Sequence, residues 1–122
     1  MIVPIYNAEK FLARCLDSLL EQGVEDYEVV CVNDGSTDGS GEILQQYHKR
    51  HPDVIKVLEQ ENRGLPAARN EGMRLAKGDV LAFCDADDYL VSGAYRYLLA
   101  NFWMEETELL WFVSVTVDGK TL

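Results

Sequence analysis

The feature that most constrains the fold is a set of short apolar runs, each followed directly by polar residues. Residues 29–32 read Val-Val-Cys-Val, with no polar residue among them. Such a run is typical of a parallel strand that is buried on both faces, because an exposed face would require alternating polar residues. Runs of similar character predict further strands at residues 2–5, 54–58, 80–84 and 109–117, the last followed by a hairpin turn at Asp118 and Gly119.

Helical patterns separate these predicted strands. Apolar residues recur at three- and four-residue spacing within residues 11–20, where we expect Asn7 to cap a helix and Gly23 to end it. A second helical stripe consists of Ile43, Leu44 and Tyr47 and is stopped by Pro52.

Two more helices are expected, one that begins near Pro66 and is closed by Gly78, and one that spans residues 92–104. The inward face of the first of these is predicted to consist of Ala68, Gly72, Leu75 and Ala76. The order along the chain is therefore β-α-β-α-β-α-β-α-β. This order predicts an α/β fold in which a mostly parallel sheet carries helices on both faces. A chain of 122 residues is at most one domain, or part of one.

Polar clusters follow four of the predicted strands directly. They are Tyr6-Asn7, residues 33–38, residues 61–64 and residues 85–88. In open α/β sheets, ligands bind outside the carboxyl ends of the strands, where such clusters would meet. The sequence alone thus predicts a single binding crevice at this edge of the sheet.

The strongest chemical signal is Asp85-Ala86-Asp87, with Asp88 beside it, at the end of a predicted strand. Neighbouring carboxylates repel one another and resist shared ionisation unless a cation is present. Oxygen ligands suit Mg²⁺ or Mn²⁺, which bind one or two carboxylates together with substrate phosphates. The alternative is a solvated turn that caps the following helix, and this alternative is strongest for Asp88.

The segment from Asn33 to Gly39 reads as a strand-to-helix turn. This reading places Asp34 at the carboxyl edge of the sheet, where it could accept a hydrogen bond from a base N–H or a ribose hydroxyl. For Ser36, Thr37 and Asp38 we favour ordinary turn and capping roles. A calcium loop fits poorly, because Gln45 stands at the twelfth position and a strand, not a helix, precedes the loop.

Arg63 and Arg69 are basic groups in an acidic chain. A guanidinium group can hold a phosphate or stack on a base, and the alternative is an ion pair with the nearby carboxylates.

The chain has 11 Lys and Arg against 21 Asp and Glu, so its net charge is 11 − 21 = −10. This charge argues against binding to a nucleic-acid backbone, which requires a basic face. No apolar run reaches the length of a membrane helix and no signal peptide is visible. The cysteines, Cys15, Cys31 and Cys84, are expected to be buried in a reducing compartment. We therefore expect a cytoplasmic protein, and whether missing segments or partners hold it at the inner face of a membrane stays open.

Four motifs occur in a fixed order, and together they resemble the N-terminal half of the family 2 glycosyltransferases with the GT-A fold. The motifs are Val3-Pro4-Ile5-Tyr6-Asn7, Val32-Asn33-Asp34-Gly35-Ser36-Thr37-Asp38, Asn62-Arg63-Gly64 with Ala68-Arg69-Asn70-Glu71-Gly72, and Asp85-Ala86-Asp87-Asp88. The resemblance covers nearly all of the chain and implies one incomplete nucleotide-sugar-binding domain over residues 1–122. At Asn33 the sequence departs from the aspartate that is commoner in the family.

The resemblance implies inverting transfer of a sugar from a nucleotide-sugar, usually a UDP-sugar, to a hydroxyl of a sugar, lipid-linked or other acceptor in polysaccharide or glycoconjugate synthesis. It implies that Pro4, Tyr6 and Asp34 hold the nucleoside, that Asp85 and Asp87 contact the ribose and a diphosphate-bound Mn²⁺ or Mg²⁺, and that Arg69 lies near the donor. The resemblance also implies that the general base that takes the acceptor's proton belongs to the later half of the family pattern, outside this chain. Asp118 is a poor candidate, because it lies in an apparent hairpin turn.

Other functions stay open. A non-catalytic nucleotide-binding or assembly module would use the same crevice. A dehalogenase-type phosphatase is disfavoured because the acidic motif follows the fourth strand instead of the first, and no GxGxxG motif supports a dinucleotide-binding domain. The apolar character of residues 109–117 also predicts self-association, with a homodimer as the expected form.

Overall fold

The computed structural model describes residues 1–104, and its centre is a three-stranded parallel sheet. The strands are β1 (Ile2–Ile5), β2 (Val29–Asp34) and β3 (Ile55–Gln60), arranged in the order β1-β2-β3. This arrangement confirms the predicted parallel α/β fold. The predicted fifth strand and its hairpin turn, residues 109–119, lie outside the described residues.

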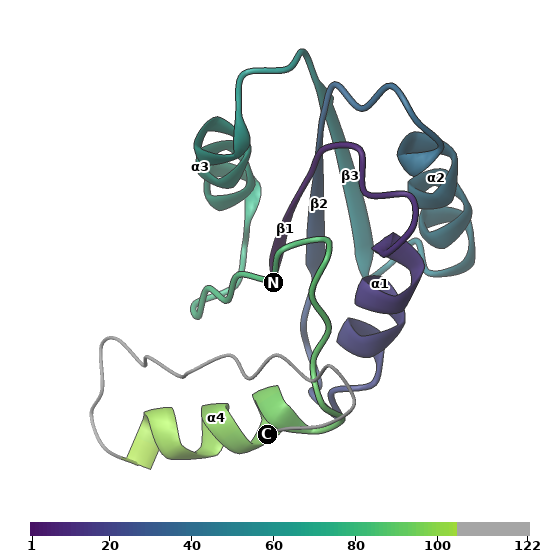
Figure 1. Ribbon diagram of the computed structural model, residues 1–122. Coiled ribbons are helices and arrows are strands. Elements are labelled where there is room, and N and C mark those ends of the chain that lie inside the picture. The colour runs from purple at the N-terminus through teal and green to yellow at the C-terminus, as the bar shows by residue number, and fades with distance from the viewer. Residues whose placement is uncertain (105–122) are drawn as a thin grey trace, which may run out of the picture.

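Helices cover both faces of the sheet, as expected (Figure 1). These helices are α1 (Leu12–Leu20), α2 (Ser40–Arg50) and α3 (Leu65–Leu75), and a fourth helix, α4 (Ala94–Met104), lies below the strands in Figure 1. In Figure 1, α1 and α2 lie on one side of the strands and α3 lies on the other. Among the described residues, no helix combines the length and the apolar character that crossing a membrane would require.

Alternate side chains of β2 pack into two separate hydrophobic cores, one on each face of the sheet, which explains the continuous apolar sequence of this strand. Val29 and Cys31 belong to the larger core with α1 and α2, whereas Val30 and Val32 pack with Ala68 of α3. Helix α3 also approaches β1 closely at Gly72, where a Cβ atom would lie 2.5 Å from Cγ2 of Ile2.

The predicted fourth strand at residues 80–84 is wrong as a regular, buried strand. The segment forms a single parallel bridge, between Phe83 and Ile2, in which the Ile2 N–H donates to Ala82 and the Cys84 N–H donates to Ile2. The next donor on this side of β1 would be residue 4, which is a proline and has no N–H group. Pairing therefore stops after Cys84, and the chain is free to turn at the acidic motif.

The burial of this segment also differs from the prediction. Leu81 and Phe83 are 43% and 42% exposed, because the segment lies at the edge of the described sheet and packs on β1 from one side only.

Two helix ends, the start of α1 and the end of α3, differ from the sequence prediction. Asn7 does not cap α1, which begins at Leu12 after Phe11. Leu75 is 44% exposed and Ala76 lies beyond the last turn of α3, so the inward face of that helix is limited to Ala68 and Gly72. Both differences arise near helix ends, where the turn of the chain decides orientation more than residue spacing does.

The three cysteines are free and buried, as predicted. Burial raises the pKa of the Cys31 thiol to about 12, which keeps it in the inert thiol form.

Candidate functional site

The carboxyl ends of the strands carry a groove of about 270 Å³. Its walls come from the turn after β1, the start of α1, the start of α3 and the acidic motif, and consist of Pro4, Tyr6, Asn7, Ala8, Phe11, Leu65, Asp85, Ala86 and Asp87. Four of the six predicted site residues therefore line one groove: Pro4, Tyr6, Asp85 and Asp87. Asp34 and Arg69 do not line it. Asp34 lies buried at the end of β2, and Arg69 reaches Asp85 from α3.

The groove combines apolar and anionic walls. The side chains of Tyr6 and Phe11 are 45% and 43% exposed, so two aromatic rings are available to a ligand. Asp85 and Asp87 supply negative charge in the same groove. A planar, uncharged group could pack on the rings, and a cation could bind to the carboxylates.

Asp34 is 1% exposed, and three donors surround its carboxylate. The backbone N–H of Arg63 and the side-chain amide of Gln60 both donate to Oδ1 at 2.8 Å, and the N–H of Gly64 donates to Oδ2 at 2.9 Å. Burial alone would raise the pKa of Asp34, but these hydrogen bonds outweigh it and hold the pKa below its ordinary value. Asp34 thus ties the end of β2 to the loop that follows β3.

Gly35 permits this close approach. Its φ is +73°, and a Cβ atom there would lie 2.7 Å from the backbone nitrogen of Asn62. Any other residue would be strained and would push away the loop that donates to Asp34.

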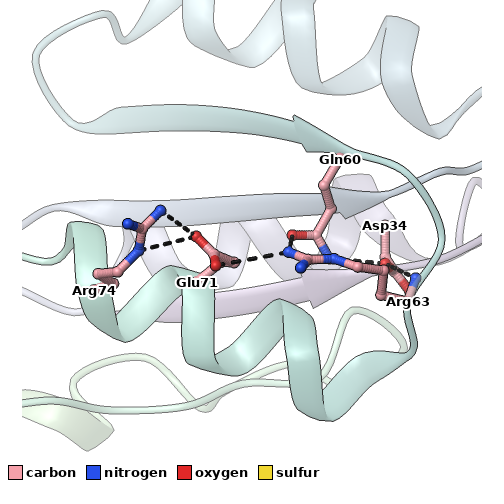
Figure 2. Close-up of polar contacts among 5 residues, drawn as sticks. All are labelled: Asp34, Gln60, Arg63, Glu71 and Arg74. Carbon is pink, nitrogen blue, oxygen red and sulfur yellow. Dashed lines mark hydrogen bonds and ion pairs between the residues drawn. The ribbon is translucent and has the colours of Figure 1, made fainter.

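Arg63 continues the same contacts onto the surface of α3 (Figure 2). Its guanidinium donates to Oε1 of Gln60 at 3.3 Å and lies 3.6 Å from Glu71, which also pairs with Arg74 at 2.7 Å. Arg74 is the main cause that lowers the pKa of Glu71. Of the two predicted roles for Arg63, the ion pair is the one that the structure contains.

The acidic motif brings three carboxylates together. One carboxylate oxygen from each of Asp85, Asp87 and Asp88 lies within 4.8 Å of the other two, the only such group of metal-ligating side chains in residues 1–104. Partial burial, followed by repulsion from Asp87 and Asp85, raises the pKa of Asp88. A set of hard oxygen donors on an exposed turn fits Mg²⁺ or Mn²⁺, which keep open positions for water and phosphate oxygens.

Arg69 forms an ion pair with this cluster. Its guanidinium lies 3.0 Å from Oδ1 of Asp85, and the two side chains are 35% and 49% exposed. The sequence left open whether Arg69 contacts phosphate or a carboxylate. In the structure it contacts a carboxylate, and the Arg69 side chain is only partly exposed to solvent.

Asn7 has a role that the sequence did not reveal. It has a left-handed backbone conformation, with φ of 48°, and its side-chain oxygen accepts hydrogen bonds from the N–H groups of Thr37 and Asp38. The Asn7 N–H in turn donates to the Ser36 hydroxyl. The turn after β1, which carries Tyr6, is therefore fixed to the turn after β2.

Asp38 has a turn role just before α2, one of the roles we favoured from the sequence, but the N-cap residue of the helix is Gly39. Oδ1 of Asp38 accepts from the N–H of Ser40 at 2.9 Å, while Oδ2 accepts from the N–H of Glu9. Burial opposes ionisation of Asp38, but these bonds outweigh it and lower its pKa.

A neighbouring side chain explains why an asparagine suits position 33. Its side-chain amide donates to Oε2 of Glu59 at 2.7 Å, where an aspartate would place two carboxylates in contact.

Arg14 of α1 is a further residue near the acidic motif. Its guanidinium lies 4.4 Å from the ring centre of Tyr89 and 5.9 Å from that of Phe11. These cation–π contacts connect α1 to the chain just after Asp88. The three-residue spacing of Phe11 and Arg14 indicates neighbours on one helix face. The sequence gave no indication that Tyr89 is the second partner of Arg14.

Comparisons with known proteins agree with this geometry. A family model described as "Glycosyl transferase family 2" matches residues 1–121. The poly(ribitol-phosphate) beta-glucosyltransferase of Bacillus spizizenii is 44% identical over 97 residues, which is 77% of this chain and 15% of that protein. The chain spans less than a third of the length of the curated relatives that head the comparison.

Two solved structures with similar folds contain nucleotide ligands. Staphylococcus aureus TarS 1-349 in complex with UDP superposes with a TM-score of 0.77 at 32% identity, over 86% of this chain and 32% of that one. The mannosyltransferase PcManGT of Pyrobaculum calidifontis, in complex with GDP-Man and Mn²⁺, gives a TM-score of 0.70 at 34% identity, over 75% of this chain and 28% of that one. The ordered motifs, the parallel sheet and the family match lead to one conclusion: this chain belongs to glycosyl transferase family 2.

Proposed function

We propose that this chain is the donor-binding part of an enzyme that transfers a sugar from a nucleotide-sugar, with a UDP-sugar as first candidate, to an acceptor hydroxyl with inversion. One observation carries the proposal: a single groove holds the ring of Tyr6 and the carboxylates of Asp85 and Asp87. A nucleoside diphosphate presents a flat base and two phosphates, which match an aromatic wall and a cation held by carboxylates.

Pro4 and Tyr6 are proposed to contact the nucleoside, with the Tyr6 ring against the base. Asp85 and Asp87 are proposed to contact the ribose and to hold Mn²⁺ or Mg²⁺ beside the diphosphate. When bound, such a cation supplies Lewis-acid stabilisation of the charge that develops on the leaving diphosphate. The Mn²⁺ complex of the similar mannosyltransferase supports the proposal that a divalent cation binds here, and the carboxylate oxygens of this chain suit either Mn²⁺ or Mg²⁺.

Asp34 is proposed to read the base or ribose. It already accepts three hydrogen bonds, and a carboxylate has about four acceptor positions. Because Asp34 is 1% exposed, a direct contact with a base N–H would require the loop after β3 to move aside, and it would use the position that remains. The protein donors keep the carboxylate ionised, so it would act as an acceptor only.

Arg69 is proposed to contact the donor while it also holds Asp85. Because the Arg69 side chain is 35% exposed and its guanidinium has several N–H donors, one edge could pair with Asp85 while another faces a phosphate. This double contact would place positive charge next to the diphosphate in a chain of net charge −10.

An inverting transfer also needs a base for the acceptor's proton, on the sugar face opposite the leaving group. We assign no residue of this chain to that role. The acceptor is proposed to be a sugar, lipid-linked or other hydroxyl in polysaccharide or glycoconjugate synthesis, which the similarity to a poly(ribitol-phosphate) glucosyltransferase supports. The predicted homodimer rests on residues 109–117 and remains a prediction.

Calorimetry with UDP tests the metal-dependent site. Wild-type protein should bind UDP more tightly in Mn²⁺ or Mg²⁺ than in EDTA, and Asp87→Asn should remove about 1–3 kcal/mol of that gain, the scale of a lost charged contact. Asp53→Asn is a matched control, because it removes one exposed acidic charge just before β3. Equal UDP affinity with and without metal in the wild-type protein would rule out the proposed site.

A UDP-release assay separates transfer from the alternative of a non-catalytic module. Protein is incubated with Mn²⁺, a panel of UDP- and GDP-sugars and varied acceptor hydroxyls. Acceptor-dependent release identifies transfer and the preferred nucleotide. Binding without release in the full-length protein would favour the non-catalytic module.

A further inference from the structure

The acidic motif, residues 85–88, lies between two residues that contact α1, Cys84 before it and Leu90 after it. Before the motif, Sγ of Cys84 lies 3.8 Å from Sγ of Cys15, and both thiols lie 3.6 Å from the Asp85 carbonyl. After the motif, the N–H of Leu90 donates to the hydroxyl of Ser18 at 3.0 Å. One helix thus contacts the chain on both sides of the carboxylates.

Gln22 extends these contacts two residues past the end of α1. It is 1% exposed, and its side-chain amide donates to the carbonyls of Ser18, at 2.8 Å, and Val91, at 3.0 Å. Its side-chain oxygen accepts from the N–H of Tyr95 at 2.9 Å. A buried amide with three hydrogen bonds is costly to desolvate, and a purely packing role would be served better by an apolar residue.

The partners of these two side chains are backbone groups outside any regular strand. Pro4 ends the pairing with β1 after Cys84, and Leu90 and Val91 belong to no helix or strand. In that stretch, the hydrogen bonds from Ser18 and Gln22 take the place of a sheet ladder. Tyr95 adds a return contact, because its hydroxyl donates to the Phe83 carbonyl at 3.3 Å.

We propose that Ser18 and Gln22 are positioning residues, which hold the backbone after the acidic motif so that Asp85 and Asp87 stay close enough to share a divalent cation. The inference rests on the proposed metal-dependent function and adds two residues that touch neither ligand nor metal. Hydrogen-bond partners of metal ligands commonly change metal affinity by ten- to a hundredfold, and Ser18 and Gln22, which act through the backbone, should lie at the lower end of that range.

The test uses two variants of the full protein, Gln22→Met and Ser18→Ala. Methionine keeps the volume of Gln22 but offers no amide, and alanine removes only the hydroxyl of Ser18. The quantity measured is the UDP dissociation constant in EDTA divided by that in Mn²⁺. We expect this ratio to fall about tenfold in each variant, while uridine affinity, measured without metal, changes less than twofold.

Ile55→Val is the control for general destabilisation. It removes one buried methylene from β3, away from the acidic motif, and should leave the ratio unchanged. Folded Gln22→Met and Ser18→Ala proteins that keep the wild-type ratio would overturn the inference but not the proposed function. A wild-type protein with a ratio of one would overturn both.

Hydrogen exchange in the wild-type protein gives a second readout, which decides the matter if neither variant folds. The amides of Leu90 and Tyr95 should exchange as slowly as those of β2. Exchange at the rate of an exposed loop would show that these bonds hold nothing in place, and would refute the positioning role.

Discussion

The two acidic ends of the site differ in how the protein treats their carboxylates. Asp34 is buried, lies in a regular strand and accepts three hydrogen bonds from the chain itself. Asp85, Asp87 and Asp88 lie on an exposed turn after pairing with β1 has ended, and Arg69 is the one cationic side chain that pairs with them in residues 1–104. The first carboxylate organises the fold around the site, whereas the second group keeps its charge available for a ligand.

Opposite pKa directions follow from this difference. At Asp34, hydrogen bonds outweigh burial and the pKa falls, whereas at Asp88 burial and two neighbouring carboxylates raise it. The protein therefore stabilises the charged form of Asp34 by its own hydrogen bonds, whereas it disfavours the charged form of Asp88.

The largest expected effect is on stability at the buried end. Asp34→Asn places an NH₂ group against at least one of the three donors, so we expect the free energy of unfolding to fall by about 2–4 kcal/mol. Urea denaturation measures it. Asp87→Asn, on the exposed turn, should change the same quantity by less than about 0.5 kcal/mol. Equal losses in the two variants would mean that the ends do not differ in the way described.

The second effect comes from metal and nucleotide together. A ligand that binds only the folded state stabilises it by RT ln(1 + [L]/Kd), about 1.4 kcal/mol at a tenfold excess over Kd. UDP with Mn²⁺ should therefore raise the melting temperature of wild-type protein, and UDP with EDTA should raise it less. The increment should vanish in Asp85→Asn/Asp87→Asn and persist in Asp53→Asn. A metal increment that survives the double substitution would place the cation elsewhere.

Acid pH should change the stability of wild-type protein more than that of Asp34→Asn. Because the folded-state pKa of Asp34 is lowered, its stabilisation is fully present above the ordinary aspartate pKa of about 3.9 and is lost as the pH falls through the folded-state pKa. Wild-type stability should thus decline below pH 4 more steeply than that of Asp34→Asn, by an amount on the order of 1 kcal/mol. Urea midpoints at several pH values between 2 and 6 would measure it, and parallel curves would contradict it.

Periodic sequence predicted most of the fold. Val29–Val32 alternate between two cores, so their continuous apolar character correctly indicated a doubly covered strand. Residues 80–84 have the same character, yet they form one bridge, because Pro4 lacks the N–H that would continue the ladder. Pairing between distant segments is not visible in the composition of either segment alone.

The site was predictable in its place and less so in its contacts. Because ligands bind beyond the strand ends in open α/β sheets, the sequence predicted one shared site, and Tyr6, Asp85 and Asp87 do line one groove. Spacing could not show that the loop after β3 folds onto Asp34, since this depends on the approach permitted by Gly35. Gln22 did leave a signal, because it continues the apolar stripe of Cys15 and Leu19, where a polar residue needs buried partners.

The smallest expected effect on stability is at Arg69. Its ion pair with Asp85 joins side chains that are 35% and 49% exposed, so solvent screens it and Arg69→Met should change the free energy of unfolding by less than about 0.5 kcal/mol.

The effect of Arg69→Met on binding should have two signs. Without nucleotide, loss of the guanidinium frees Asp85 for a cation, so Mn²⁺ alone should bind more tightly. With UDP, the loss removes positive charge near the diphosphate, so UDP affinity in Mn²⁺ should fall. Arg74→Met, which breaks a surface pair with Glu71 on the same helix, should change neither affinity. Calorimetry of Mn²⁺ alone and of UDP in saturating Mn²⁺ separates the two effects. If both affinities fall together, Arg69 supports the acidic motif instead of competing with the cation for it.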